Sequence, residues 1–211
     1  MATHRFVILV SANSEWRAAK QHYQVTETGT TPFGETFDVL IEGEPVLFLH
    51  SGWGKTTTAA ATQYTIDHYH PALITNVGSC GGLQGKVEVG QMLLVDSCVQ
   101  YDIYESMTTY AQAVDHYRVN NEYPWITAAL PGNTHKAPLA SADQDIQPSQ
   151  VIRLMEEFGV GAADWETASF AWVAQRNQVP WLALRVVTDL VSSQFSETTE
   201  NAELWRERGR G

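Results

Sequence analysis

The stretch Leu73–Leu83, LITNVGSCGGL, decides the fold. Its first five residues are mostly apolar or β-branched, which is typical of a buried strand. Gly78-Ser79-Cys80-Gly81-Gly82 follows at once and predicts a tight loop that closes the strand, because glycine adopts turn conformations at little steric cost. Three glycines and a serine directly after a strand can hold a sugar or an anion through backbone N–H groups, and a packed turn without a ligand has the same composition.

Regular elements are predicted on the N-terminal side of this stretch. The apolar run Phe6–Val10 predicts a buried strand, and Ser11-Ala12-Asn13-Ser14 behind it is typical of a helix N-terminus. The elements predicted here are, in chain order, that strand, a helix over Glu15–His22, a hairpin of Val39–Ile41 and Val46–Leu49, and a helix over Lys55–His68 that ends before Pro71.

Strands and helices also alternate on the C-terminal side. The elements predicted there are a strand over Met92–Val95, an excursion of polar and aromatic residues over Tyr101–Pro138, a short strand over Ala137–Ser141, helices over Ser149–Phe158 and Trp165–Arg176, and a buried strand over Pro180–Val187 that ends in Thr188-Asp189. This alternation predicts an α/β fold with three layers, α/β/α, around a central mixed sheet. In such folds ligands bind at the carboxyl ends of the strands.

The composition limits the class of protein. A chain of 211 residues with 44% hydrophobic residues suits a single domain, residues 1–211, with a core on both faces of a sheet. The 24 acidic and 13 basic side chains give a net charge of -11, which disfavours nucleic acid and anionic membranes as partners. Two cysteines are too few for a disulfide framework, and the first apolar run is too short for a leader or a membrane span, so we expect a cytoplasmic protein.

The chain contains further residues of types that can carry chemistry. Gly54-Lys55-Thr56 is similar to the end of a phosphate-binding P-loop, but Leu49 stands where that motif needs a glycine, which excludes it. Gly52 still permits backbone N–H groups to approach a ligand, or forms a tight turn without one. Cys80 has no histidine placed near it in the sequence, so we expect a small buried residue at the ligand and not a nucleophile.

Four segments resemble, in the same order, segments of the nucleoside phosphorylase and nucleosidase superfamily. They are Val10–Glu15, Ser51–Lys55, Asn76–Leu83 with Val89-Gly90, and Asp164–Ala168 with Arg185–Asp189. The resemblance spans most of the chain and is greatest to the 5′-methylthioadenosine/S-adenosylhomocysteine nucleosidases and the futalosine hydrolases. It implies a phosphorylase/hydrolase-like fold and an enzyme that breaks the bond between a base, here of the purine type, and a ribose-type sugar.

The resemblance also implies roles for individual residues. Glu166 would accept hydrogen bonds from the ribose 2′ and 3′ hydroxyls and stabilise an oxocarbenium-like charge, with Trp165 beside it lining the sugar. Asp189 would be the general acid that protonates the leaving base, and Glu15 the base that activates water. The residue types alone also permit a helix cap at Asp189 and a solvated first-turn glutamate at Glu15.

The base-binding residues depart from the family pattern. Ser79 and Gly81 would hold the sugar or the nucleophile, as in the family. Asp145, however, stands where the methylthioadenosine nucleosidases carry an aromatic residue that stacks on adenine, so the identity of the base stays open. Ile146 would present its backbone to the base, while Trp53 or Trp165 would supply a stacking face. After Asp189 the family's closing helix is short or absent, and Leu190–Thr199 is expected to form a mobile lid.

Water is the expected nucleophile, because the Gly-Asp-Pro-x-Arg run that binds phosphate in the phosphorylases is absent. Arg17 is the only basic residue near that position, and an exposed helix residue is the simpler interpretation. His68 and His70 lack a third ligand, so no metal and no organic cofactor are expected. The family implies a homodimer, in which Tyr101–Pro131 reaches the neighbouring subunit. The alternatives are a phosphate-dependent phosphorylase and a catalytically silent nucleoside-binding protein.

Overall fold

The computed structural model describes residues 5–107, 109–126 and 128–197. Its elements are β1 (Phe6–Val10), α1 (Asn13–His22), β2 (Gly29–Thr30), β3 (Glu35–Ile41), β4 (Glu44–His50), α2 (Lys55–Tyr69), β5 (Leu73–Leu83), β6 (Met92–Gln100), α3 (Tyr110–His116), β7 (Val119–Asn120), β8 (Thr134–Ser141), η1 (Pro148–Gln150), α4 (Val151–Glu156), β9 (Ala162–Asp164), α5 (Thr167–Arg176) and β10 (Trp181–Val191). None of the described helices is long and apolar enough to cross a membrane.

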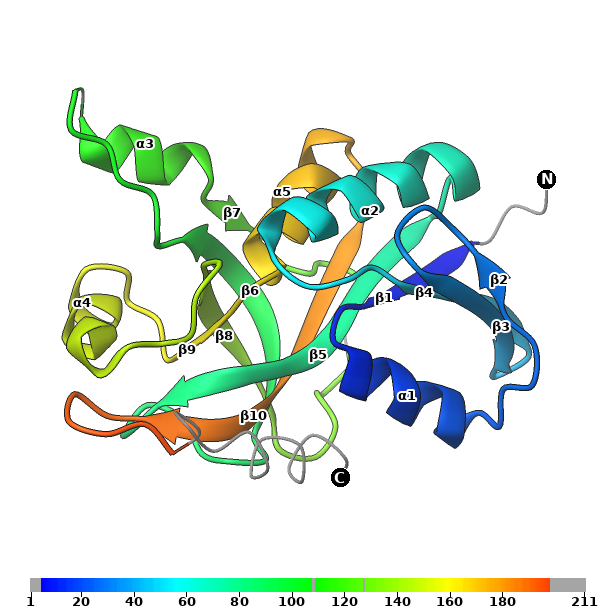
Figure 1. Cartoon of the computed structure of the whole chain (residues 1–211), viewed down its shortest axis with the longest axis horizontal. Helices are drawn as coiled ribbons and strands as arrows, with labels where there is room; N and C mark the ends of the chain where they lie inside the picture. Colours follow the sequence, from blue (N-terminus) through cyan, green and yellow to red (C-terminus); the bar gives the residue numbers. More distant parts are fainter. Residues whose placement is uncertain (1–4, 108, 127, 198–211) are drawn as a thin grey trace.

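The strands form one mixed sheet in the order β10-β6-β8-β9-β5-β1-β4-β3-β2, with β7 added to β6. β1 pairs in parallel with β4 and β5, and β10 pairs in parallel with β5. The pairs β3–β4, β5–β9 and β6–β10 are antiparallel. The predicted mixed sheet is therefore confirmed, and its central parallel strands run in the same direction, with β5 and β10 extending past the end of β1 (Figure 1).

Helices cover both faces of this sheet, because apolar side chains of β1 point to both faces and are packed on each of them. Val7 and Leu9 belong to the core that includes α2 and α5, which pack against each other. Val10 belongs to a second core, which contains Trp16 of α1. Because successive strand residues point to opposite faces, α1 lies on the face opposite to α2 and α5 (Figure 1). The predicted three-layer α/β/α fold is confirmed.

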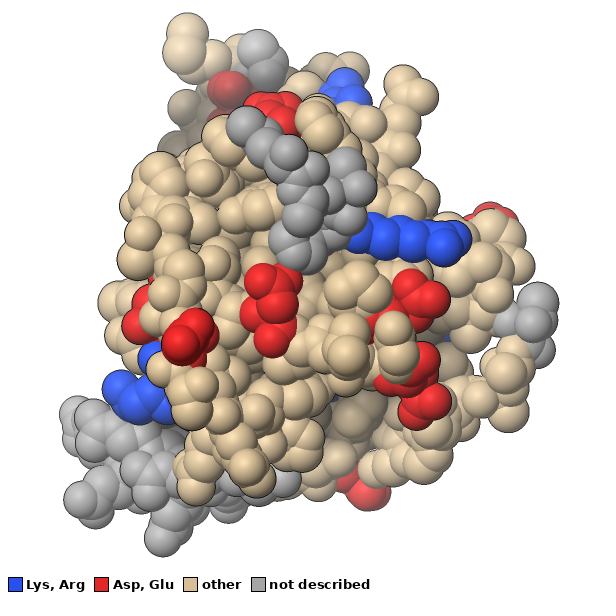
Figure 2. All heavy atoms as spheres, turned by 90° about the vertical axis from the view of Figure 1, so that its right-hand side faces the viewer, with Lys and Arg blue, Asp and Glu red and all other residues tan. Residues whose placement is uncertain are grey.

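The hairpin and the first long helix lie where the sequence predicts them. β3 and β4 pair antiparallel around Glu42 and Gly43, whose φ angles of 52° and 83° are the left-handed values that a two-residue hairpin turn needs. α2 ends at Tyr69, and its C-cap residue His70, directly before Pro71, has a left-handed φ of 48°. On the face that carries β2 and β3, acidic side chains are visible at more places than basic ones, in keeping with the net charge of -11 (Figure 2).

The prediction of a loop over Gly78–Gly82 is wrong, because β5 continues through these residues to Leu83. β10 pairs with β5 along this whole segment, so the backbone stays extended. A Cβ at Gly82 would lie 2.6 Å from a methyl group of Val87 and 2.7 Å from one of Val187. The glycine therefore makes room for neighbouring side chains instead of turning the chain.

Other predicted boundaries also shift, and for β6 the reason is strand pairing that the sequence pattern does not reveal. β6 runs on to Gln100 because it pairs with β8 on both sides of a register shift after Val95. The short strand β9 was not predicted, and α5 begins at Thr167, two residues later than expected. The excursion contains α3 and β7.

The predicted lid over Leu190–Thr199 is wrong in its first part, since Leu190 and Val191 belong to β10. A turn follows, in which the Ser192 N–H donates to the Phe195 carbonyl at 2.7 Å. Residues 198 and 199, and the expected short or absent closing helix, lie outside the described residues.

Candidate active site

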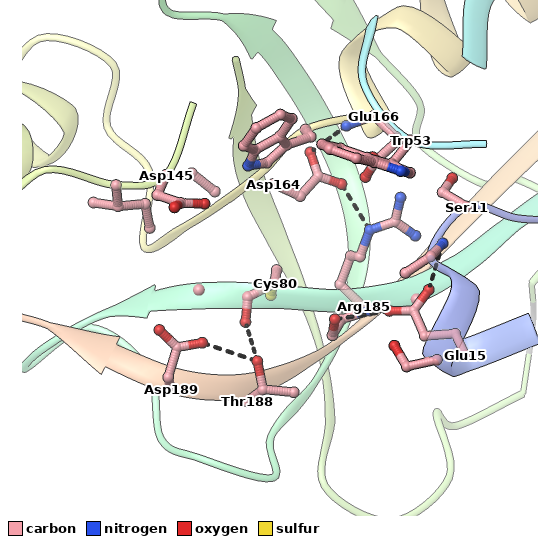
Figure 3. Close-up of a pocket in the computed structure, with 18 of the residues that line it drawn as sticks. Ser11, Glu15, Trp53, Cys80, Asp145, Asp164, Glu166, Arg185, Thr188 and Asp189 are labelled. Carbon is pink, nitrogen blue, oxygen red and sulfur yellow. Dashed lines mark hydrogen bonds and ion pairs between the residues drawn. The ribbon is translucent and has the colours of Figure 1, made fainter. Parts of the chain in front are cut away.

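A cavity of about 750 Å³ opens at the carboxyl ends of β1 and β5 and beside β10. Eight of the nine site residues predicted from the sequence line it: Glu15, Ser79, Cys80, Gly81, Ile146, Trp165, Glu166 and Asp189. Gly52, the ninth, is not part of the lining; its φ of 72° shapes the turn that carries Trp53 to the cavity. Figure 3 shows Asp189 and Glu15 on different sides of this cavity, with Glu166 at a third.

Glu15 reaches the cavity from the first turn of α1, where it is only partly exposed. One carboxylate oxygen accepts hydrogen bonds from the backbone N–H and the hydroxyl of Ser79, both at 2.7 Å. A Cβ at position 78 would lie 2.9 Å from the other oxygen, so Gly78 is needed for this close approach. The sequence alternative of a fully solvated Glu15 is therefore wrong, because β5 fixes its carboxylate.

Glu166 lies just before α5 and is 9% exposed. Its carboxylate accepts a hydrogen bond of 2.9 Å from the backbone N–H of Gly54. Burial raises the pKa of Glu166 to about 7, and the negative charge of Asp164 adds to this increase. A buried carboxylate of this kind interacts strongly with hydroxyl donors and with positive charge that develops in the cavity.

A buried ion pair underlies the position of Glu166. Asp164 and Arg185 are 2.7 Å apart, and their side chains are 2% and 1% exposed. Asp164 also accepts hydrogen bonds from the backbone N–H groups of Glu166 and Thr167, both at 3.2 Å, which fixes the start of α5. Arg185 donates to the backbone carbonyl and the side chain of Asn76 on β5. The network therefore ties the start of α5 to the central strands.

No role was assigned from the sequence to Asp164 or Arg185, although both stand in segments that resemble the family. The pattern of charged residues in the sequence could have indicated that the two residues are buried and paired. Arg185 interrupts the apolar run of β10, and Asp164 follows two buried alanines. A charged residue inside a buried run requires a partner of opposite charge, but the sequence pattern does not say which one.

Asp164→Asn is expected to lower the free energy of unfolding by about 3–5 kcal/mol, because Arg185 would stay buried without its counter-charge. Urea unfolding followed by circular dichroism would measure the change. The matched control is Asp115→Asn, which breaks an exposed pair with Arg118 at 3.3 Å. The control should cost less than about 1 kcal/mol. Equal losses in the two variants would contradict a structural role for the buried pair.

Glu166→Gln is expected to make the protein more stable at pH 8. The pKa of Glu166 rises from 4.5 to about 7 on folding, so its stabilising contribution is complete below pH 4.5 and is lost as the pH rises through 7. Glutamine is uncharged at every pH, and its advantage above pH 8 should reach the order of 3 kcal/mol. Thermal unfolding at pH 5 and pH 8 measures it. A gain of the same size at both pH values, or a similar gain in Glu156→Gln on the surface, would refute this explanation.

Asp189 lies within β10 and is 6% exposed. One of its carboxylate oxygens accepts a hydrogen bond of 2.9 Å from the Thr188 hydroxyl. A Cβ at Gly81 would lie 2.9 Å from the end of the Ile146 side chain and 3.7 Å from the other oxygen of Asp189. Gly81 therefore leaves open the space in which Ile146 and Asp189 approach each other. The helix-cap alternative for Asp189 is wrong, because no helix begins at this strand residue.

Two tryptophans lie on another side of the cavity. The ring centroids of Trp53 and Trp165 are 5.4 Å apart, with planes tilted by 58°. Trp53 is 60% exposed, so its face is available to a planar group. Cys80 is 4% exposed, and burial raises the pKa of its thiol. Such a thiol is a poor nucleophile, in agreement with the expectation of a small buried residue.

The charge of the lining restricts its ligands. Five acidic residues face two basic ones, the acids being Glu15, Asp145, Asp164, Glu166 and Asp189 and the bases Arg17 and Arg185. Arg185 is neutralised by Asp164, whereas Arg17 is exposed on α1. Among the described residues, no group of His, Cys, Asp and Glu side chains is arranged to hold a metal ion. The arrangement suits a neutral ligand with several hydrogen-bond donors.

The fold and the site therefore define a three-layer α/β protein with an acid-lined cavity beside its parallel strands β1, β5 and β10. Comparison with known families then identifies it: the chain belongs to the phosphorylase superfamily, whose model matches residues 5–210.

Relatives and solved structures agree with this membership. The chain is 24% identical to a 5′-methylthioadenosine/S-adenosylhomocysteine nucleosidase of Bacillus cereus, over 90% of this chain and 87% of that protein. The structure of a nucleosidase with the same name from S. pneumoniae, solved with a transition-state inhibitor, has a TM-score of 0.78 at 20% identity and covers 97% of this chain and 93% of that one. A futalosine hydrolase mutant of Helicobacter pylori has a TM-score of 0.77 at 17% identity, with coverages of 97% and 93%.

Proposed function

We propose that this protein is a nucleosidase that hydrolyses the N-glycosidic bond of a purine-type nucleoside, such as methylthioadenosine or adenosylhomocysteine. The observation that carries the proposal is the convergence of Glu15, Glu166 and Asp189 on one cavity from three elements of the sheet and helix layers (Figure 3). The proposal is also supported by relatives that are named as nucleosidases and that match most of this chain.

In this proposal the bond between C1′ of the sugar and a ring nitrogen of the base breaks with oxocarbenium character. Asp189 gives its proton to that base, and the electron pair of the broken bond stays on the base. Glu166 accepts hydrogen bonds from the 2′ and 3′ hydroxyls, and its negative charge stabilises the positive sugar. Glu15 takes a proton from water, whose oxygen then bonds to C1′. The products are the free base and the free sugar.

Each assignment uses a different environment. Two donors of Ser79 hold one oxygen of the Glu15 carboxylate. The other oxygen accepts a long hydrogen bond of 3.4 Å from the Ala12 backbone N–H and has a second lone pair that can orient a water molecule. Glu166 is buried beside Asp164, so hydroxyl donors replace the water that it has lost. Asp189 and Ile146 lie close together beside Gly81 in the lining of the cavity, and the proposal places the base against them. Trp165 would then cover the sugar, and Trp53 the outer part of the substrate.

Hydrolysis is favoured over phosphorolysis by the charge of the cavity. Phosphate carries a negative charge, and it would meet an excess of acidic side chains in the lining even with Asp164 paired to Arg185 and Asp189 as the proton donor. Arg17 is the observation that favours the second candidate, a phosphate-dependent phosphorylase, because its side chain belongs to the same lining. A protein that binds nucleosides without turnover is the third candidate.

The test is the release of free base from a panel of nucleosides, each with and without phosphate. The panel contains methylthioadenosine, adenosylhomocysteine, inosine, uridine and futalosine. Release that does not depend on phosphate supports the nucleosidase. The phosphorylase is supported if the base is released only when phosphate is present and if the Arg17→Gln variant loses this release. Binding without any release supports the silent binding protein.

The proposed enzyme acts as a cytoplasmic homodimer. Both cysteines are free and buried, which suits a reducing compartment. Tyr104 and Met107, in the segment between β6 and α3, are 88% and 91% exposed. Exposed large apolar side chains are common at interfaces between subunits. Light scattering during gel filtration would test the dimer, and a monomeric mass would contradict it.

A further inference from the structure

One end of the cavity is formed by the loop after β8 together with β5 and β10. Gln144, Asp145, Ile146 and Gln147 of this loop all belong to the lining. Ile146 and Asp189 approach the same point above Gly81. Figure 3 shows Asp145 and Asp189 on the same side of the cavity, opposite to Glu15, with Asp145 on the loop and Asp189 on β10. We refer to this region, Gln144–Gln147 with Gly81 and Asp189, as the base end.

In the base end, the carboxylate of Asp145 can only accept hydrogen bonds, whereas the amides of Gln144 and Gln147 can both donate and accept. Asp145 is exposed, while Asp189 is buried and is the proton donor of the proposed reaction. Neither arginine of the lining belongs to this region: Arg17 lies on α1, and Arg185 is held by Asp164 and Asn76. An exposed carboxylate at neutral pH accepts hydrogen bonds and donates none. The part of the region beside Asp145 therefore favours a ligand group that donates a hydrogen bond.

We propose that Asp145 determines which base the site takes, by accepting a hydrogen bond from an exocyclic amino group. This inference rests on the proposed nucleosidase function and narrows its substrate class to amino-bearing purines. An oxo group at the same position would place an acceptor against the carboxylate, so both groups would be desolvated without a partner. Among the described residues, none donates a hydrogen bond to the Asp145 carboxylate. The backbone carbonyl of Asp145 accepts one from the Gln147 side chain.

The experiment compares wild type with Asp145→Asn, which has the same shape but can also donate. Calorimetric titration with free adenine and free hypoxanthine measures the preference without any turnover. Wild type should bind adenine at least roughly tenfold more tightly than hypoxanthine, the lower range for a hydrogen bond to a charged group. Asp145→Asn should reduce this ratio roughly tenfold. Glu156→Gln, which removes an exposed charge on α4 outside the cavity, should leave the ratio unchanged.

The same ratio is then measured as kcat/KM for adenosine against inosine. The inference is overturned if neither base binds, if wild type prefers hypoxanthine, or if Asp145→Asn keeps the wild-type ratio within twofold. If the calorimetric ratios change as expected but no nucleoside is hydrolysed, the proposed function fails while the role of Asp145 in base selection stands. Asp145→Asn should keep its melting temperature, because its side chain is exposed.

Discussion

Asp189→Asn is expected to lower kcat for base release by about 10²–10⁴-fold, the usual contribution of general acid catalysis. Asparagine has nearly the same shape, and its amide oxygen can still accept the hydrogen bond from Thr188. What it lacks is the proton that the leaving base needs. KM should change little, because the base keeps its packing surface of Gly81 and Ile146. Steady-state kinetics with a nucleoside substrate measures both constants.

The leaving group provides the sharper control. A 4-nitrophenyl riboside has a leaving group that departs without a proton, so Asp189→Asn should hydrolyse it nearly as fast as wild type. The control variant is Asp96→Asn, which makes the same change on β6, the strand that pairs with β10. Asp96 does not line the cavity. This variant should be fully active on both substrates. Full activity of Asp189→Asn on nucleosides would remove Asp189 from the mechanism.

Glu15→Gln is expected to reduce kcat by a similar factor of about 10²–10⁴, because glutamine cannot take a proton from water. The glutamine side chain can still accept from the N–H and the hydroxyl of Ser79, so the first turn of α1 should stay in place. Unlike Asp189→Asn, this variant should be slow on the 4-nitrophenyl riboside as well, since water must be activated for any leaving group. Comparing Asp189→Asn with Glu15→Gln therefore separates protonation of the leaving base from activation of water.

Ser79→Ala offers a graded comparison for Glu15. It removes one of the two hydrogen bonds of 2.7 Å to the carboxylate but leaves the backbone donor. A loss of roughly tenfold is expected, which is the value of one hydrogen bond to a charged group. Glu44→Gln in the exposed hairpin serves as the charge control and should be as active as wild type. If Glu15→Gln and Glu44→Gln behave alike, the assignment of Glu15 as the base is wrong.

The sequence was most informative where local pattern and local chemistry coincide. The apolar runs of β1 and β4, the Glu42-Gly43 turn and the end of α2 before Pro71 were predicted within a few residues. These features depend on residues that are neighbours in the chain, such as a glycine that permits a left-handed turn. Eight of the nine predicted site residues line the cavity because their segments resemble those of a family with the same fold.

The glycines of β5 show where local pattern failed. In sequence Gly78, Gly81 and Gly82 read as a loop, because a run of glycines usually breaks a strand. In the folded protein each of them gives space to a side chain from elsewhere: Glu15 at Gly78, Ile146 at Gly81 and Val187 at Gly82. A glycine can break a strand or make space for a neighbouring side chain. Which of these it does depends on the residues that pack against it, and these are distant in the chain.

The sequence by itself determined the α/β class, the order of most strands and helices, and the negative charge, and its resemblance to a family proposed residues for the site. Only the tertiary structure decided that Asp164 pairs with Arg185, that Asp189 lies inside β10, and that Asp145 and Asp189 share one end of the cavity. The physical reason is that strand periodicity, turns and net charge are properties of neighbouring residues or of composition. A buried ion pair, and a site built from β1, β5, the loop after β8 and β10, exist only after distant segments have packed together.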